Sequence, residues 1–306
     1  MNTPADIPVM EIPTSEVLKH FDWKMFYAIW GVKYGSAAAE AMELMQLRRD
    51  AEDELAMEDF RIMLTARFFQ ACSENDDIFF EVDGVRMNLP MFRQESGKGL
   101  SLADFVIPEE SGRKSPFGIF AISVRKKTKA HVQGCSCPAC SNAYEDMIAR
   151  TVRMTVAEAA SVWLDNVTKS GKLNETGLPD GVRIIKPAAG YASCPDHTLK
   201  GDILKLLCGD IHMHSDSHNH SDGCTCGHCH ANENPLGIEL TESYAMIPES
   251  SICGLIFMHP QACYPEIRRI SEQQYESYTD RRGMNKETAR RFLGHLLKVV
   301  ADKPLT

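Results

Sequence analysis

Cysteine occurs twice in this 306-residue chain at the same Cys-X-Cys-X-X-Cys spacing, in the segments GCSCPAC and GCTCGHC. Clustered thiolates bind zinc, copper(I) and iron–sulfur clusters, and in a long chain without a secretion signal they favour metal or redox chemistry over disulfides. The second segment is also rich in histidine, whose imidazole suits the same metals. The predicted metal ligands are Cys135, Cys137, Cys140, Cys224, Cys226, Cys229, His228 and His230.

The spacing of these residues leaves the kind of metal site open. It is not the spacing of a standard zinc finger, and neither segment supplies the four cysteines of a simple iron–sulfur site. One interpretation is a specific structural zinc site, which the two segments could share. A second is a loop that sequesters metal without a defined structure, and a third is an iron–sulfur cluster that supplies electrons.

A second chemically dense segment reads KPAAGYASCPDHTLK and runs from Lys186 to Lys200. Its two prolines restrict the backbone, whereas Gly190 permits a positive φ or a close approach to a ligand. The Asp-His-Thr run can hydrogen-bond the loop and cap the helix that follows. We interpret this segment as a preformed ligand cradle in which His197 is structural rather than a catalytic base.

The charge of the chain excludes several kinds of partner. With 33 lysines and arginines against 42 acidic residues, the formal net charge is -9, and binding to phosphate backbones depends on basic residues. We therefore expect no nucleic-acid partner. The N-terminus has no basic start followed by an apolar core, and no apolar run of about 18 residues occurs, so we expect a cytoplasmic protein with no membrane partner.

Helices are predicted in three regions that could carry these segments. Residues 37–69 are rich in alanine, leucine, methionine and glutamate, with Ser36 as a possible cap, and we expect helix over most of this range. Apolar residues with a 3.6-residue period predict a long helix over 142–169. A third helix is expected over 284–303, with Asn285 as its cap.

Strands are predicted from short apolar runs bounded by turn residues. Residues 78–82 precede Asp83-Gly84, a dipeptide that favours a tight hairpin. Residues 118–124 and 251–258 read as buried strands, and 240–246 alternates like a half-buried one. Strand and helix do not alternate regularly and no phosphate-binding glycine loop is present, so we predict an α+β fold with a mainly antiparallel sheet.

Five ordered blocks of the sequence closely resemble the S-adenosylmethionine-binding activation domain of cobalamin-dependent methionine synthase. They are DWKMFYAIWGVKYG, SLADFVIPEESGRKSPFGIFAISV, TVAEAASVWL, KPAAGYASCPDHTLKGDILKLL and LTESYAMIPESSICGLIFMHPQACY. The resemblance implies a curved single domain over residues 1–306, with a twisted antiparallel sheet flanked by helices. Relative to the family pattern, the Cys-rich segment near 131–141 and the His/Cys-rich segment near 209–236 are inserts.

The resemblance also implies a set of ligand-binding residues. The family motif RxxxGY, whose arginine binds the carboxylate of S-adenosylmethionine, is matched by residues 186–191, so lysine replaces arginine. Lysine keeps the charge but loses the two-pronged geometry of the guanidinium, and Arg183 could compensate only if the loop bends toward it. The implied ligand-binding residues are Asp22, Glu158, Lys186, Ala188 through its carbonyl, Gly190, Tyr191 and Tyr264.

By the same resemblance, the domain supports reductive methylation of cob(II)alamin to methylcobalamin, with S-adenosylmethionine as the methyl donor. The sulfonium already activates the methyl group, so no catalytic side chain is expected, and Tyr191 is expected to face the corrin. The chain lacks the other modules of methionine synthase. Its expected partners are therefore a truncated cobalamin-dependent methionine synthase that carries the cobalamin and a flavodoxin-like electron donor.

Two other functions stay open at this point. The first is a zinc-handling protein on the same scaffold without methyl-transfer activity, which the lysine substitution and the two inserts would favour. The second is methyl transfer to a different corrinoid protein, which only the identity of the partner would reveal.

Overall fold

The computed structural model of the chain describes residues 3–32, 38–57, 59–127, 143–171, 178–209, 213–214 and 234–297. The strands are β1 Ile7–Glu11, β2 Phe60–Glu74, β3 Asp77–Val82, β4 Val85–Pro90, β5 Ser115–Lys126, β6 Arg183–Ile185, β7 Met213–His214, β8 Glu239–Thr241, β9 Met246–Ile247 and β10 Ser251–His259. The helices are α1 Thr14–Leu18, α2 Trp23–Ile29, α3 Ala38–Ala56, α4 Ala143–Ser170, α5 Leu199–Cys208, α6 Glu272–Arg281 and α7 Lys286–Leu293. Three short 3-10 turns are η1 Leu102–Phe105, η2 Glu109–Ser111 and η3 Gly294–Leu296.

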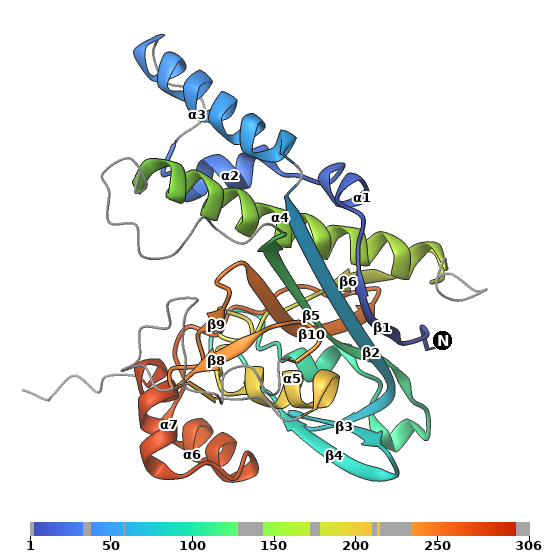
Figure 1. Cartoon of the computed structure of the whole chain (residues 1–306). Coiled ribbons are helices and arrows are strands. Elements are labelled where there is room, and N and C mark those ends of the chain that lie inside the picture. Colours follow the sequence, from blue (N-terminus) through green and yellow to red (C-terminus); the bar gives the residue numbers. More distant parts are fainter. Residues whose placement is uncertain are drawn as a thin grey trace, which may run out of the picture.

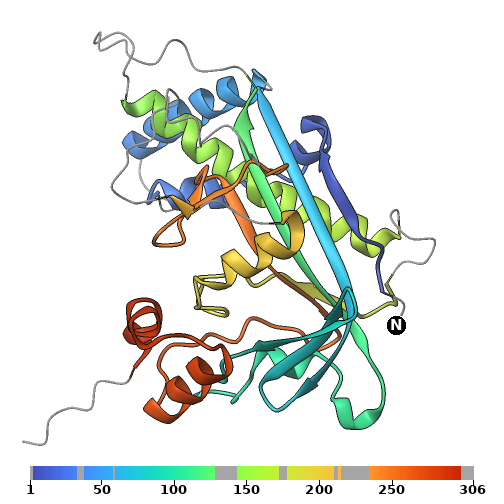
Figure 2. The ribbon, with the colours of Figure 1, turned by 60° about the horizontal axis from the view of Figure 1, so that its bottom comes forward.

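An antiparallel sheet forms the centre of the described part of the chain, in the order β4-β3-β2-β5-β10-β6, with β1 beside β2. A smaller sheet joins β7, β8 and β9. Helices α1 to α4 lie on one face of the central sheet and α5 lies on the other, as Figures 1 and 2 show together. The predicted α+β fold with a mainly antiparallel sheet is therefore confirmed.

Both faces of the central sheet are buried. Along β5, Phe117, Ile119 and Ala121 belong to the core beneath α5, whereas the intervening Phe120 and Ile122 belong to the core beneath α4. Successive side chains of a strand point to opposite faces, so one apolar run can serve two cores. This explains why residues 118–124 and 251–258, which lie within β5 and β10, carry almost no polar residues.

Burial on both faces also explains an error in the helix prediction for residues 37–69. The helix α3 ends at Ala56, and from Phe60 the chain forms the 15-residue strand β2. Nearly every residue of β2 up to Phe69 is buried or half-buried, because β2 lies between β5 and the β1 and β3 strands with packed layers on both sides. Its first ten residues contain an unbroken apolar run at Ile62–Leu64 rather than strict polar alternation, and periodicity alone does not separate such a short apolar run from the end of a buried helix.

Other predicted elements have mixed outcomes. The hairpin at Asp83-Gly84 is confirmed, with φ of 49° and 81° at the two turn residues, and the long helix α4 is also confirmed. Residues 240–246 are not one strand, because the chain turns at Tyr244, where φ is 58°, between β8 and β9. Asn285 caps α7 by accepting from the Thr288 N–H at 2.8 Å, but α7 ends at Leu293 rather than continuing toward 303.

No described helix combines the length and the apolar character that crossing a bilayer requires.

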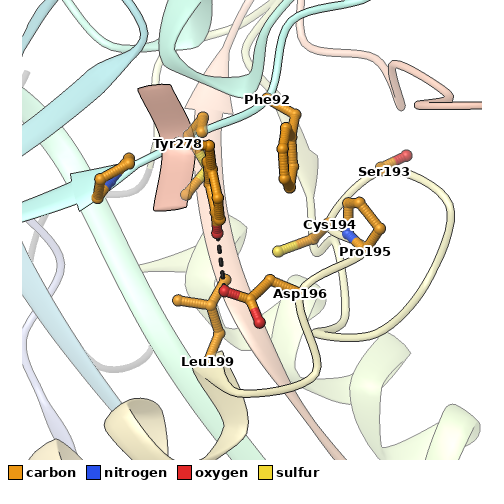
Figure 3. Close-up of a pocket in the computed structure, with 9 residues that line it drawn as sticks. Phe92, Ser193, Cys194, Pro195, Asp196, Leu199 and Tyr278 are labelled. Atoms are coloured by element: carbon orange, nitrogen blue, oxygen red, sulfur yellow. Dashed lines mark hydrogen bonds between the residues drawn. The ribbon is translucent and has the colours of Figure 1, made fainter. Parts of the chain in front are cut away.

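A buried carboxylate joins α6 to the loop before α5. Asp196 is 1% exposed and accepts from the Thr198 N–H at 2.8 Å and from the Tyr278 hydroxyl at 2.8 Å. The ring of Tyr278 stacks on Phe92 with a centroid separation of 3.8 Å, and Figure 3 shows the two rings face to face above the carboxylate. Arg282 balances the charge, with Nε 3.4 Å from Asp196.

We predict that Tyr278→Phe lowers the free energy of unfolding by about 1–2 kcal/mol, because a buried carboxylate oxygen loses a hydrogen-bond donor. Tyr275→Phe, on the same helix, is the matched control and should leave stability nearly unchanged. Urea denaturation of both variants measures the difference. Equal midpoints for Tyr278→Phe and the wild type would contradict this role for the Tyr278 hydroxyl.

Candidate functional site

The site is formed where one face of α4 meets the loop that follows β6. Glu158 and Asp165 are seven residues apart on α4, two helical turns, so they lie on the same side of the helix. Lys186 is the first residue after β6 and points to the same layer as Ile184, whose side chain packs against the α4 core. Two carboxylates and one ammonium thus meet beside the sheet.

Lys186 is the central charge of this group. Its Nζ forms an ion pair with Oδ1 of Asp165, and its side chain is only 8% exposed. Burial lowers the pKa of Lys186, while the charges of Asp165 and Glu158 act in the opposite direction. An ammonium in this position needs negative partners to remain charged, and α4 provides two.

Glu158 is the less completely paired of the two carboxylates. Burial raises the pKa of Glu158, and the charge of Lys186 opposes this shift without cancelling it. A half-buried carboxylate with a raised pKa gains from any further positive charge placed beside it. Glu158 is therefore suited to receive a cationic group of a ligand.

Tyr264 connects the start of the loop to the segment after β10. Its hydroxyl accepts from the Lys186 N–H at 3.0 Å, and burial of that end of the side chain raises the pKa of the phenol. The residue as a whole is nevertheless 58% exposed. Tyr264 thus fixes the backbone of Lys186 while it presents an aromatic surface to solvent.

Beyond Lys186, the loop packs directly on β10 at Gly254. The Leu255 N–H donates to the Pro187 carbonyl and the Ala189 N–H donates to the Cys253 carbonyl, both at 3.1 Å. A Cβ on Gly254 would lie 2.8 Å from the Cα of Ala188 and would also collide with the Pro187 carbonyl. Only glycine at this strand position allows the backbone of the loop to approach so closely.

The tip of the loop is a tight turn. The Gly190 N–H donates to the Cys194 carbonyl at 2.7 Å, and Gly190 has a φ of 92°. A Cβ on Gly190 would lie 2.6 Å from Nδ1 of His197, so the imidazole packs closely against the glycine. The Ala188 carbonyl already accepts from the Tyr191 N–H at 3.2 Å, and Tyr191 itself is 68% exposed.

His197 has a supporting position under this turn. Nζ of Lys200 lies 3.1 Å from Nδ1 of His197, and because an ammonium can only donate, Nδ1 is the acceptor. Burial lowers the pKa of His197, and the charge of Lys200 lowers it further. The contacts with Gly190 and Lys200 agree with the structural interpretation of His197.

Asp22 lies apart from this group. It is the N-cap of α2, where Oδ1 accepts from the Lys24 N–H at 2.8 Å, and its side chain is exposed. The segment approaches α4 two residues earlier, because His20 Nε2 lies 3.3 Å from Asn166 Nδ2. No hydrogen bond among the described residues joins Asp22 to Glu158, Lys186 or Tyr264, so its ligand role stays a prediction.

The structure therefore brings Glu158, Lys186 and Tyr264 together and places the turn from Ala188 to Tyr191 next to them. Arg183 is exposed and shares its strand face with Ile185, opposite to Lys186, so it does not substitute for the missing arginine. The sequence interpretation missed Asp165, although its seven-residue spacing from Glu158 was a usable signal. It also missed Gly254, whose signal was a glycine inside an apolar strand.

The eight predicted metal ligands all lie outside the described residues. Within the described ranges, no group of three or more His, Cys, Asp or Glu side chains could hold a metal ion. The described flanks of the two Cys-rich segments do come together at one end of the sheet. Ser123 near the end of β5 donates to the Leu236 carbonyl at 2.6 Å, and the guanidinium of Arg125 packs on Gly237.

A separate small pocket lies behind the loop, as Figure 3 shows. Its lining includes Cys194, Asp196 and Tyr278, and none of the seven predicted ligand-binding residues contributes to it. Asp196 is already hydrogen-bonded by Thr198 and Tyr278. The polar groups of this pocket are used for the fold, so it is a weaker candidate than the α4 face.

We predict that Glu158→Gln stabilises the chain near neutral pH by about 1 kcal/mol or less. Burial holds the pKa of Glu158 above its ordinary value of about 4.3, so the folded state retains a proton that the unfolded state has lost. Ionisation of Glu158 therefore lowers the free energy of unfolding as the pH rises from the unfolded pKa through the folded pKa. Below both pKa values the carboxyl group is neutral in both states, and the advantage of glutamine should vanish.

Urea denaturation at pH 7.5 and near pH 4 measures this difference. Glu276→Gln, at an exposed position on α6, is the matched control and should change stability little at either pH. A Glu158→Gln variant less stable than the wild type at pH 7.5 would show that the carboxylate is stabilised by its partners rather than penalised by burial.

Comparison with known proteins places this chain in a family. A family model described as "Vitamin B12 dependent methionine synthase, activation domain" matches residues 13–215 and 214–283. Among solved structures, the crystal structure of the MetH reactivation domain bound to AdoHcy superposes with a TM-score of 0.75 and 24% sequence identity, over 97% of this chain and 93% of that chain. This likeness shows a common fold, and the family match covers most of the sequence. The chain belongs to the activation-domain family of vitamin B12-dependent methionine synthase.

Proposed function

We propose that this chain binds S-adenosylmethionine between α4 and the loop after β6, and that it supports reductive methylation of cob(II)alamin on a separate cobalamin-dependent methionine synthase. The observation that carries the proposal is the meeting of Glu158, Lys186 and Tyr264 beside a tight glycine turn. Family membership and the AdoHcy bound to the related MetH domain support it. We treat residues 1–306 as one activation-type domain with two inserts.

The charges of the site suit the charges of this ligand. S-adenosylmethionine carries a carboxylate, an ammonium and a positive sulfonium. The ammonium of Lys186 offers a partner for the carboxylate, and Glu158, with its raised pKa, offers one for a cationic group. Asp22 is exposed near the same region of α4 and would add a second acid for the cationic groups.

Aromatic groups and the turn backbone would complete the ligand site. The exposed surface of Tyr264 can pack against the adenine, and the glycine turn lets the ligand approach the main chain without a Cβ. Tyr191, exposed at the tip of the loop, is our candidate for the residue that faces the corrin of the partner.

The role of the protein in such a reaction is placement. S-adenosylmethionine would give its methyl group from the sulfonium and leave as S-adenosylhomocysteine, and cob(II)alamin carried by the partner, with one electron from a flavodoxin-like donor, would accept that methyl group. No side chain has to act as a nucleophile or a strong base, so the residues need only bind the ligand, orient its methyl group and limit access of water.

We predict that calorimetric titration of S-adenosylmethionine into the full chain shows binding at one site. Glu158→Gln should weaken this binding about tenfold or more, because the ligand loses a charge-assisted contact at a half-buried position. Glu276→Gln is the matched control and should bind like the wild type. Absence of binding to a chain that circular dichroism shows to be folded would overturn the proposal.

A second candidate function is zinc binding by the two Cys-rich segments. What favours it is the position of their described flanks, since the end of β5 and residues 234–237 are joined by the Ser123–Leu236 hydrogen bond and the Arg125–Gly237 contact. Cysteine and histidine are the preferred ligands of zinc, and segments anchored side by side can contribute to one site.

We predict that one zinc ion binds per chain and that replacing the three cysteines of either segment by serine weakens zinc binding at least tenfold. Zinc titration with measurement of bound metal tests this for Cys135, Cys137 and Cys140, and separately for Cys224, Cys226 and Cys229. Unchanged affinity in either triple variant would exclude a shared site. Zinc binding without any binding of S-adenosylmethionine would favour metal handling over the first proposal.

A further inference from the structure

The cation of the proposed ligand site already has a partner within the protein. Lys186 Nζ forms an ion pair with Asp165 Oδ1, and the two side chains are 8% and 23% exposed. The ammonium is therefore enclosed together with its counter-ion. Lys186 is therefore neither unpaired nor open to solvent before a ligand binds.

Asp165 is held in place by the helix rather than by a network of its own. It lies near the C-terminal end of the 28-residue helix α4, and Lys186 is its hydrogen-bond partner among the described residues. On the other side, Lys186 is fixed through its backbone, which donates to the Tyr264 hydroxyl at 3.0 Å. The ion pair thus bridges α4 and the start of the loop.

The charge balance of the group opposes a third carboxylate. Glu158 and Asp165 together carry two negative charges, against one positive charge on Lys186. The Lys169 ammonium is close enough to act on Lys186, but its side chain is exposed. A ligand carboxylate that approaches Lys186 must therefore displace Asp165 or share one compact ammonium with it. An ammonium has three donors but no planar fork, so it offers two carboxylates a single compact charge rather than the two-pronged contact of a guanidinium.

We propose that Asp165 is a positioning residue that sets ligand affinity by competing with the ligand carboxylate for Lys186. In the free protein Asp165 forms the ion pair with the Lys186 ammonium. In the complex the carboxylate of the methionine part of S-adenosylmethionine forms that ion pair instead. This inference rests on the proposed binding of S-adenosylmethionine and adds to it a chain-specific determinant of affinity.

The sign of the effect separates competition from a structural role. If Asp165 competes, Asp165→Asn should bind S-adenosylmethionine about threefold to tenfold more tightly, because the ligand no longer displaces a charged partner. If Asp165 only supports the fold or contacts the ligand cation, the same variant should bind more weakly. 5′-Methylthioadenosine, which has the thioether nucleoside but no carboxylate or ammonium, should bind the wild type and the variant equally.

Lys186→Arg provides a second variant that keeps the ion pair. A guanidinium has enough donors to hold Asp165 and a ligand carboxylate at once, so this variant should also bind S-adenosylmethionine more tightly than the wild type. It keeps the test decisive if Asp165→Asn, which leaves a buried ammonium without its counter-ion, does not fold.

Calorimetric titration of the 306-residue wild type, Asp165→Asn and Lys186→Arg with both compounds tests the proposal. Tighter binding of S-adenosylmethionine by the folded variants, with unchanged binding of 5′-methylthioadenosine, supports competition. Unchanged or weaker binding by the variants, beside a wild type that binds, overturns the role of Asp165 and leaves the proposed function intact. Failure of all three folded proteins to bind S-adenosylmethionine overturns both.

Discussion

The close packing of the loop after β6 on strand β10 is the constraint on which the site depends. Glycine at position 254 lets the backbone of residues 187–189 lie directly on the strand, where it forms two main-chain hydrogen bonds. Because the loop is fixed there, the side chain of Lys186 points toward α4. For the same reason, the turn at Gly190 packs on His197. The sheet, buried on both faces, provides the rigid base for this arrangement.

The charges of the site determine which ligand groups it favours. α4 places two carboxylates against one buried ammonium, and burial moves the pKa of Glu158 up and that of Lys186 down. Both shifts mean that the charged forms cost free energy in the absence of a ligand. A zwitterionic ligand of the kind proposed would pair these charges and recover part of that cost, so stability and affinity would be linked at one helix face.

Local chemistry made part of this predictable from sequence. The Asp83-Gly84 turn, the periodic helix α4 and the cap at Asn285 follow from the local sequence, and the loop that resembles RxxxGY led to the candidate site. The strand β2 was mistaken for helix because burial on both faces removes polar alternation. Asp165 was missed because its importance comes from tertiary contact with Lys186, and the Cys- and His-rich segments lie outside the described residues.

A crystal structure of the chain with S-adenosylhomocysteine, the demethylated form of the proposed ligand, tests the central claim most directly. The account predicts that the ligand lies between α4 and the 186–191 loop, with its carboxylate on Lys186 in the place of Asp165 and its ammonium near Glu158. Density for the ligand elsewhere, such as the pocket beside Phe92 and Tyr278, would contradict it. So would a bound ligand that leaves the Lys186–Asp165 pair intact and makes no contact with Glu158.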